Sequence, residues 1–273
     1  FKSIIAGTDP TVYTGWRAGI FADVFDPAFE AFARELASDG RGEFSLPGLA
    51  RTPWLLGTTI DDANDTYGFG QRPQALPSNY HSHLGWVAAV TAPTQNGSAV
   101  YTKLAFRDFL RQRYQSLGAL NAAWGSTYTS WDSNGGWPTG TGVLDESGRH
   151  PWIGQDFDGL SDAAPRVKAD LDEFLEALAD QYFKVVAGAV RAYTPNRLVF
   201  SPSAIGAGAR PEVLRAAGRH LDVLQVWAPP DRLDLVKEAF DVSGKPVFVW
   251  STLQAQADSP WAGRPGSAPS YEY

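Results

Sequence analysis

Three aspartates at the end of a short apolar run are the residues of this chain best placed to do chemistry. Asp61, Asp62 and Asp65 follow residues 54–60, an apolar run with β-branched residues that predicts a strand buried on both faces. In parallel sheets, reactive groups gather at the carboxyl ends of strands. Because like charges raise one another's pKa, one of these carboxyls is a candidate general acid. Alternatively, the acids cap the next turn, a position that Asp favours regardless of function.

An alternation of strands and helices must hold these acids in place. The runs at 198–201, 223–227 and 247–250 begin about 24 residues apart, which is typical of a repeating strand–helix unit with parallel pairing. A closed barrel and a doubly wound open sheet fit this periodicity equally well. Further strand candidates are 3–6 and 54–60, and apolar residues recur at helical spacing over 29–36, 106–117, 171–186 and 233–240.

The segment from Leu104 to Gly125 resembles a helix of the agarases and beta-galactosidases in the large retaining clan of glycoside hydrolases. In those families the helix after the fourth barrel strand ends in Leu-Asn-x-x-Trp-Gly, and here residues 120–125 read Leu-Asn-Ala-Ala-Trp-Gly. Four more segments resemble the same families in the same order along the chain. They are 22–29 before strand four, 194–200 at the start of strand five, 221–226 in strand six and 245–249 in strand seven.

This resemblance implies an α/β fold, a (β/α)8 TIM barrel of which the chain holds roughly strands three to seven. The first strands and the last strand of the barrel are then absent from residues 1–273, which we interpret as a single, partial barrel domain. Two long insertions, 65–101 and 126–162, are rich in glycine and aromatic residues. Long loops in compact domains are usually functional or disordered, so we expect these two to wall a cleft.

Glycoside hydrolysis needs two carboxyl groups, one that protonates the leaving oxygen and one that acts as nucleophile or activates water. The resembled families place a Glu at the end of strand four and another at the end of strand seven, where this chain has Ala63 and Ser251. An offset of one residue would put Asp62 at the first position, so Asp62 is our candidate general acid. Asp258 is the nearest carboxylate after Ser251 and would activate water in an inverting arrangement.

Polar and aromatic side chains near the strand ends are candidates for binding sugar. Asn64 and Asp65 would bind hydroxyl groups, while Asp61 would point to the opposite face of its strand. Trp227 and Trp250 end neighbouring strands and would offer flat faces to a sugar, although capping the barrel core is an equally good interpretation. The other candidates for substrate contacts are Tyr67, Trp86 and Gln225.

The sequence therefore predicts a glycoside hydrolase that acts on a polysaccharide or oligosaccharide, with a galactan or agar-type glycan implied by the resemblance. The alternative is a non-catalytic carbohydrate-binding barrel that has lost both catalytic glutamates. A third class, a scaffold that docks protein through its aromatic loops, is also compatible with the sequence. We expect the protein to be secreted or periplasmic.

Composition narrows the choice of partner. With 23 basic and 30 acidic residues, the net charge of −7 and the scattered cations argue against nucleic acid. No apolar stretch approaches the roughly 18 residues of a membrane span, so no membrane partner is expected. The chain has no cysteine, His81 and His83 lack a patterned carboxylate, and Gly206 and Gly208 lack the third glycine of a dinucleotide site. We expect neither a metal nor a cofactor.

Overall fold

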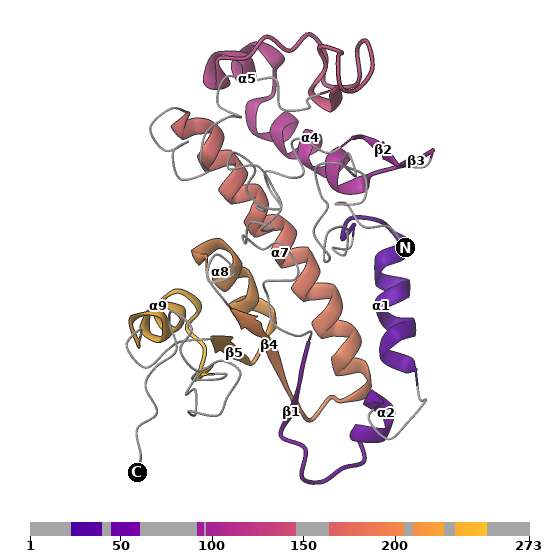
Figure 1. Cartoon of the computed structure of the whole chain (residues 1–273), viewed down its shortest axis with the longest axis vertical. Coiled ribbons are helices and arrows are strands. Elements are labelled where there is room, and N and C mark those ends of the chain that lie inside the picture. The colour runs from indigo at the N-terminus through magenta and orange to yellow at the C-terminus, as the bar shows by residue number, and fades with distance from the viewer. Residues whose placement is uncertain are drawn as a thin grey trace, which may run out of the picture.

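A parallel sheet with helices along one face forms the framework of the molecule (Figure 1). The computed structural model describes residues 23–39, 45–60, 92–95, 97–145, 164–204, 210–226 and 233–249. The strands are β1 (Gly57–Thr59), β2 (Thr94–Gln95), β3 (Ser98–Ala99), β4 (Leu198–Ala204), β5 (Val223–Val226) and β6 (Val247–Val249). The helices are α1 (Ala28–Ser38), α2 (Leu46–Leu49), α4 (Tyr101–Tyr114), α5 (Leu117–Trp124), η3 (Val143–Asp145, a 3-10 turn), α7 (Pro165–Tyr193), α8 (Pro211–His220) and α9 (Leu233–Ser243).

The sheet has the strand order β1-β4-β5-β6, and every neighbouring pair is parallel. Between consecutive strands of this sheet the chain passes through α7, then α8, then α9. Parallel strands need such crossovers, and helices usually supply them. The predicted α/β fold with parallel pairing is therefore confirmed, while the described strands by themselves form an open sheet rather than a closed barrel. Strands β2 and β3 form a small antiparallel hairpin before α4.

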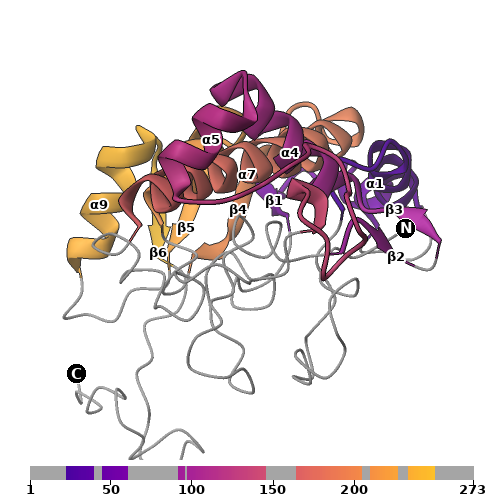
Figure 2. The ribbon, with the colours of Figure 1, turned by 90° about the horizontal axis from the view of Figure 1, so that it is seen from above.

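The helices pack side by side over one face of the sheet. Helix α7 contacts α1 on one flank and α8 on the other, and α8 in turn contacts α9. Figure 2 shows α1, α7 and α9 on the same side of the strands. Leu171, Phe174 and Leu178 of α7 are almost completely buried, as are Val199 and Leu224 of the sheet. Burying a side chain of this size stabilises a fold by about 1.5–3 kcal/mol, so this layer contributes substantially to stability.

The first strand of the sheet differs from its prediction. A strand was predicted over 54–60, but pairing with β4 begins only at Gly57. The prediction that the whole run is buried on both faces was wrong, because Trp54 and Leu56 are 91% and 69% exposed. Thr59 is exposed as well, whereas the next residue, Ile60, is buried. A side chain at position 57 would meet the carbonyl oxygen of Leu198 at 2.3 Å, so glycine is required where the two strands come closest.

The segment that resembles the agarase helix forms two helices rather than one. Gln115 has a φ of 61°, a left-handed conformation that ends α4. The side chain of Ser116 then accepts a hydrogen bond from the backbone N–H of Ala119 and caps the start of α5. Gly125, at a φ of 65°, ends α5 in the same way as Gln115 ends α4. The break lies inside an otherwise continuous apolar pattern, which explains why the pattern alone did not predict it.

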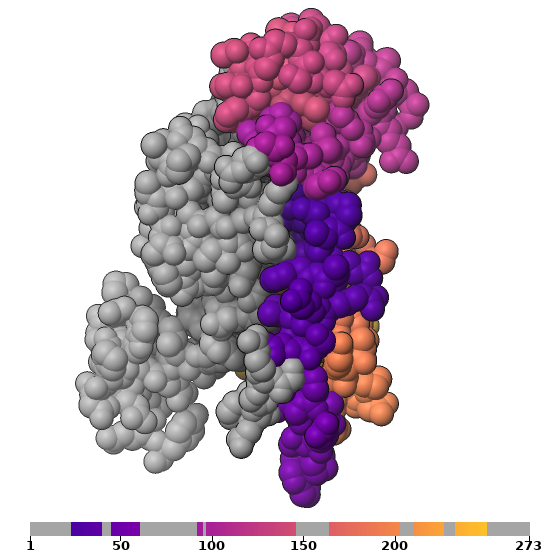
Figure 3. All heavy atoms as spheres, turned by 90° about the vertical axis from the view of Figure 1, so that its right-hand side faces the viewer, coloured from indigo at the N-terminus to yellow at the C-terminus, as the bar shows by residue number. Residues whose placement is uncertain are grey.

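The described part of the second insertion, residues 126–145, folds around a buried carboxylate. Asp145 is fully buried and accepts hydrogen bonds from the hydroxyl of Ser133 at 2.5 Å and from the backbone N–H groups of Asn134 and Gly142 at 2.5 and 3.1 Å. Figure 3 shows this segment with α4 and α5 above the band formed by α1, α2 and β1. Whether it walls a cleft remains a prediction.

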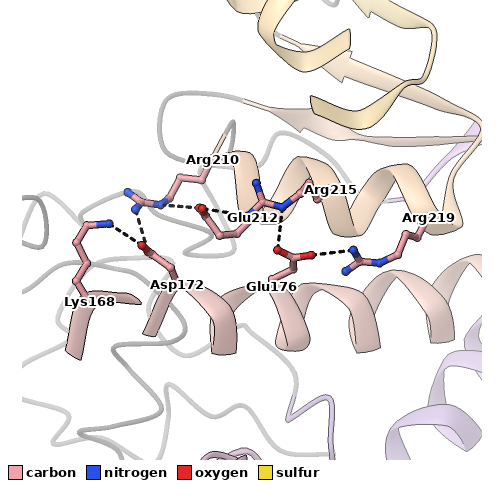
Figure 4. Close-up of polar contacts among 7 residues, drawn as sticks. All are labelled: Lys168, Asp172, Glu176, Arg210, Glu212, Arg215 and Arg219. Atoms are coloured by element: carbon pink, nitrogen blue, oxygen red, sulfur yellow. Dashed lines mark hydrogen bonds and ion pairs between the residues drawn. The ribbon is translucent and has the colours of Figure 1, made fainter. Parts of the chain in front are cut away.

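Ion pairs join α7 to α8 on the outer surface (Figure 4). We call them the ion-pair ladder. Asp172 accepts from Lys168 and from Arg210, at 2.6 and 3.2 Å. The carboxylate of Glu176 forms ion pairs with Arg215 at 2.9 Å and with Arg219 at 2.8 Å. The ladder therefore joins the two helices at successive turns. Its members are Lys168, Asp172, Glu176, Arg210, Glu212, Arg215 and Arg219.

Candidate functional site

Gln225 is the sequence-predicted site residue that the described part of the chain contains. It lies on β5, where it was predicted to be. The other predicted site residues lie outside the described residues, and their placement remains a prediction: Asp61, Asp62, Asp65, Asp258, Asn64, Tyr67, Trp86, Trp227 and Trp250.

The side chain of Gln225 lies on the face of the sheet that α7, α8 and α9 do not cover. Its register partner on β6 is Phe248, and its Nε2 donates a hydrogen bond to Oγ1 of Thr59 at 2.7 Å. Thr59 is paired with Phe200, whose ring contacts that of Phe248 edge-to-face at 6.3 Å between centroids. Paired residues of neighbouring strands share a face of the sheet. We call this face the inner face, and it carries Thr59, Leu198, Phe200, Gln225 and Phe248.

A bulge in β4 brings a third polar side chain to Gln225. The register between β4 and β5 shifts between Phe200 and Ser203. At this shift the hydroxyl of Ser201 accepts the backbone N–H of Gln225 at 2.7 Å and donates to the carbonyl of Pro202, also at 2.7 Å. Bulges often redirect side chains beside functional sites. Thr59, Ser201 and Gln225 thus form a polar row across three neighbouring strands.

The polar row is neutral and deeply placed. Ser201 and Gln225 are 5% and 4% exposed, although the row ends on exposed Thr59. A carboxamide offers two N–H donors and a carbonyl acceptor, and the described contacts of the Gln225 side chain use one donor. Within the described residues, its carbonyl oxygen and second N–H are not taken. The described contacts therefore leave these two groups as the unused hydrogen-bonding capacity of the Gln225 side chain.

Phe248 is an aromatic group of the inner face that sequence reasoning missed. Its side chain is 53% exposed and is the register neighbour of the Gln225 carboxamide. The sequence analysis expected the sugar platform from Trp227 and Trp250 instead. The available signal was alternation, because Val247 and Val249 pack against the helix-covered core and the residue between them must face the other way. An exposed ring beside an amide suits a ligand with both C–H and hydroxyl groups.

The buried carboxylates of the described residues have structural roles. Asp23 accepts hydrogen bonds from the backbone N–H groups of Tyr101 and Thr102 at the start of α4, and burial raises its pKa. Asp170 of α7 is fully buried and accepts from the hydroxyl of Tyr114 and from Nε1 of Trp124, at 2.5 and 2.7 Å. Asp23 thus ties the segment before α1 to the start of α4, and Asp170 ties α7 to α4 and α5.

The described residues contain neither a metal-binding cluster nor a membrane-spanning helix. Nowhere in them do three or more His, Cys, Asp or Glu side chains gather closely enough to hold a metal ion. None of the described helices combines the length and the apolar character that crossing a membrane would require.

The sequence and the fold can both be compared with those of known proteins. No family model matches the sequence. Beta-agarase B from a Vibrio species is 24% identical over 206 residues, which cover 76% of this chain and 18% of the relative. A solved exo-beta-agarase aligns with 91% of this chain and 28% of its own, with a TM-score of 0.64 and 29% identity. The chain has an agarase-like fold.

A second solved agarase supports the same conclusion. It is 24% identical to this chain, with a TM-score of 0.64, and the alignment covers 90% of this chain and 30% of the agarase. The agarase-like resemblance predicted from sequence is thus confirmed for the fold. The chain spans less than a third of the length of these agarases.

Proposed function

We propose that this agarase-like chain belongs to a glycoside hydrolase and carries part of its binding site for an agar-type glycan. The observation that carries the proposal is the match to an exo-beta-agarase, at 29% identity over 91% of this chain. The inner face adds a physical reason, since it combines a buried carboxamide with a half-exposed phenyl ring. Because agar-type polysaccharides are polymers, we place the protein outside the cytoplasm, secreted or periplasmic.

The candidate catalytic acid is close in sequence to the polar row. Asp62 is three residues beyond Thr59, the last residue of β1. Asp61 and Asp65 follow the same strand. In a parallel sheet the carboxyl ends of neighbouring strands meet at one edge, which supports a site shared between these acids and Gln225. We assign to Asp62 the protonation of the leaving oxygen.

The candidate platform residues follow two strands of the inner face in sequence. Trp227 is two residues beyond Gln225, and Trp250 is two residues beyond Phe248. This closeness in sequence supports a binding surface built from the ends of β5 and β6.

The proton-donor role is testable by varying the leaving group. Asp62→Asn should reduce the turnover of an agarose-derived oligosaccharide by at least about a hundredfold and that of an activated aryl glycoside much less, because a good leaving group needs little protonation. Steady-state kinetics of the full chain with both substrates measures the contrast. Equal losses on the two substrates would contradict this role of Asp62.

A non-catalytic carbohydrate-binding barrel is the second candidate function. The observation that favours it is the presence of Ala63 and Ser251 where the agarase resemblance implies catalytic glutamates. A protein that retains agarose in a binding assay but releases no reducing ends would establish this second function. Release of reducing ends that Asp62→Asn abolishes would establish the first.

A further inference from the structure

We infer that Thr59 and Ser201 are positioning residues that hold the Gln225 carboxamide so that its carbonyl oxygen binds a hydroxyl group of the glycan. This inference rests on the proposed function and names the group that contacts the sugar. Gln225 is bound at both ends, by Ser201 at its backbone N–H and by Thr59 at its Nε2, each at 2.7 Å.

The direction of the carbonyl follows from the geometry of an amide. The oxygen and nitrogen of a carboxamide are fixed in one plane and point away from each other. Because Nε2 of Gln225 donates to Thr59 on β1, the carbonyl oxygen is turned away from that hydroxyl. It remains an acceptor with no partner among the described residues, and a sugar hydroxyl is a donor that matches it.

Thr59 and Ser201 hold Gln225 in place before any ligand binds, which is called preorganisation. A glutamine has three rotatable side-chain bonds, and ordering them when a ligand binds would weaken the affinity. In this molecule the ordering takes place during folding. The bulge in β4 is part of the arrangement, because it places the hydroxyl of Ser201 at the backbone N–H of Gln225.

The chain contains its own control for the role of Thr59. The preceding residue, Thr58, is also a threonine of β1, but its Oγ1 is buried and has no hydrogen-bond partner among the described residues. Neighbouring residues of a strand point to opposite faces of the sheet. The same substitution at 58 and at 59 therefore removes a hydroxyl of the same strand in two settings, of which only one reaches Gln225.

The test compares four variants of the full chain by calorimetric titration with an agarose-derived tetrasaccharide. Gln225→Leu and Thr59→Val should each weaken binding about tenfold, the loss expected for one hydrogen bond of good geometry. Thr59→Ser keeps the hydroxyl and should bind within about twofold of the wild type, as should Thr58→Val. Thermal unfolding of each variant checks that the fold is kept. Wild-type affinity in a folded Thr59→Val protein would overturn the inference.

A second measurement separates this inference from the proposed function. The side-chain amide signals of Gln225 can be followed by NMR without any ligand. Thr59→Val should shift them and increase their exchange with water, while Thr58→Val should leave both unchanged. If the wild type fails to bind the tetrasaccharide, the proposed function is wrong, and with it the sugar contact. If the amide signals ignore Thr59→Val, the positioning role is wrong whatever the protein binds.

Discussion

The polar row and the ion-pair ladder both cross from one element to the next, but they do so in opposite surroundings. The row consists of neutral groups, and Ser201 and Gln225 within it are at most 5% exposed. The ladder consists of charged side chains whose exposure rises from 14% at Glu212 to 46% at Arg219. In the row, Gln225 has one hydrogen bond to Thr59 and one to Ser201. In the ladder, Glu176 pairs with two arginines.

The number of charges in a region is therefore a poor guide to how much stability a single substitution there removes. An exposed ion pair is worth about 0–1 kcal/mol because water and salt screen it. A buried polar group that loses its partner costs about 1–3 kcal/mol, because water cannot replace the lost bond. The small neutral row should therefore respond to single substitutions more strongly than the exposed end of the ladder, where Arg215 and Arg219 lie. Glu176 keeps one arginine partner when the other is removed, whereas the Gln225 carboxamide has Thr59 as its described partner.

The largest effect is expected where burial and charge coincide. Asp170 is fully buried and pairs with Arg113 at 2.9 Å, and it also accepts from Tyr114 and Trp124. Asp170→Ala should lower the free energy of unfolding by about 3–5 kcal/mol, because it leaves buried donors without an acceptor. Urea unfolding followed by circular dichroism measures it. Glu30→Ala is the control, because the Glu30–Arg34 pair of α1 is 60% and 62% exposed, and it should cost about 1 kcal/mol or less. Equal losses would refute the role given to burial.

An intermediate effect is expected within the polar row. Ser201→Ala removes the acceptor of the Gln225 N–H in a buried setting and should cost about 1–3 kcal/mol in the same unfolding experiment. Thr58→Val is the control, since it removes a buried hydroxyl that has no described partner, and it should change stability by no more than about 0.5 kcal/mol or increase it. A larger cost at Thr58 than at Ser201 would mean that the contacts of the row do not determine its stability.

The smallest effect is expected at Asp180, next to the ladder, and it should depend on pH. Burial alone would raise the pKa of Asp180, but hydrogen bonds from Arg219 and His220 and their charges lower it below the ordinary value of 3.8. A lowered pKa in the folded state gives stability that is present above the unfolded pKa and is lost as the pH falls through the folded one. Asp180→Asn should therefore cost about 1 kcal/mol or less at neutral pH. This difference from the wild type should vanish on acidification through the region below 3.8.

The control for this pH experiment comes from the polar row. Ser201→Ala introduces no titrating group, so its cost should be the same at neutral and acidic pH and at low and high salt. The cost of Asp180→Asn should shrink when salt is added, because the pairs with Arg219 and His220 are partly exposed. A pH-independent cost at Asp180 would show that its carboxylate acts through packing and not through charge.

Local patterns predicted the elements of the second half of the chain well. The strands β4, β5 and β6 lie within or across their predicted runs, since buried apolar residues of fixed spacing specify a strand without help from distant contacts. The helical spacing predicted over 171–186 and 233–240 lies within α7 and α9 for a similar reason, because one face of each helix is apolar. The break at Gln115 was missed, because a left-handed glutamine has no sequence signal of the kind that glycine provides.

The candidate site was predictable only in part. Gln225 was found through the resemblance and its position near a strand end. Its partner Thr59 was not, because the two are 166 positions apart and nothing local in either segment indicates their contact. Ser201 gave no signal as a support for Gln225 either, since that role depends on a shift of register between two strands. Interactions of this kind arise when the sheet is assembled.

The link between Thr59 and Gln225 also has a consequence for the order in which the molecule folds. Strands β4, β5 and β6 follow one another closely with α8 and α9 between them, so this part can assemble through short loop closures. Strand β1 must instead close a loop that contains α4, α5 and the whole of α7 before it reaches β4. Closing a longer loop costs more chain entropy, and contacts between distant residues slow folding. We therefore expect the bond from Thr59 to Gln225 to form late, once the sheet has reached its final register.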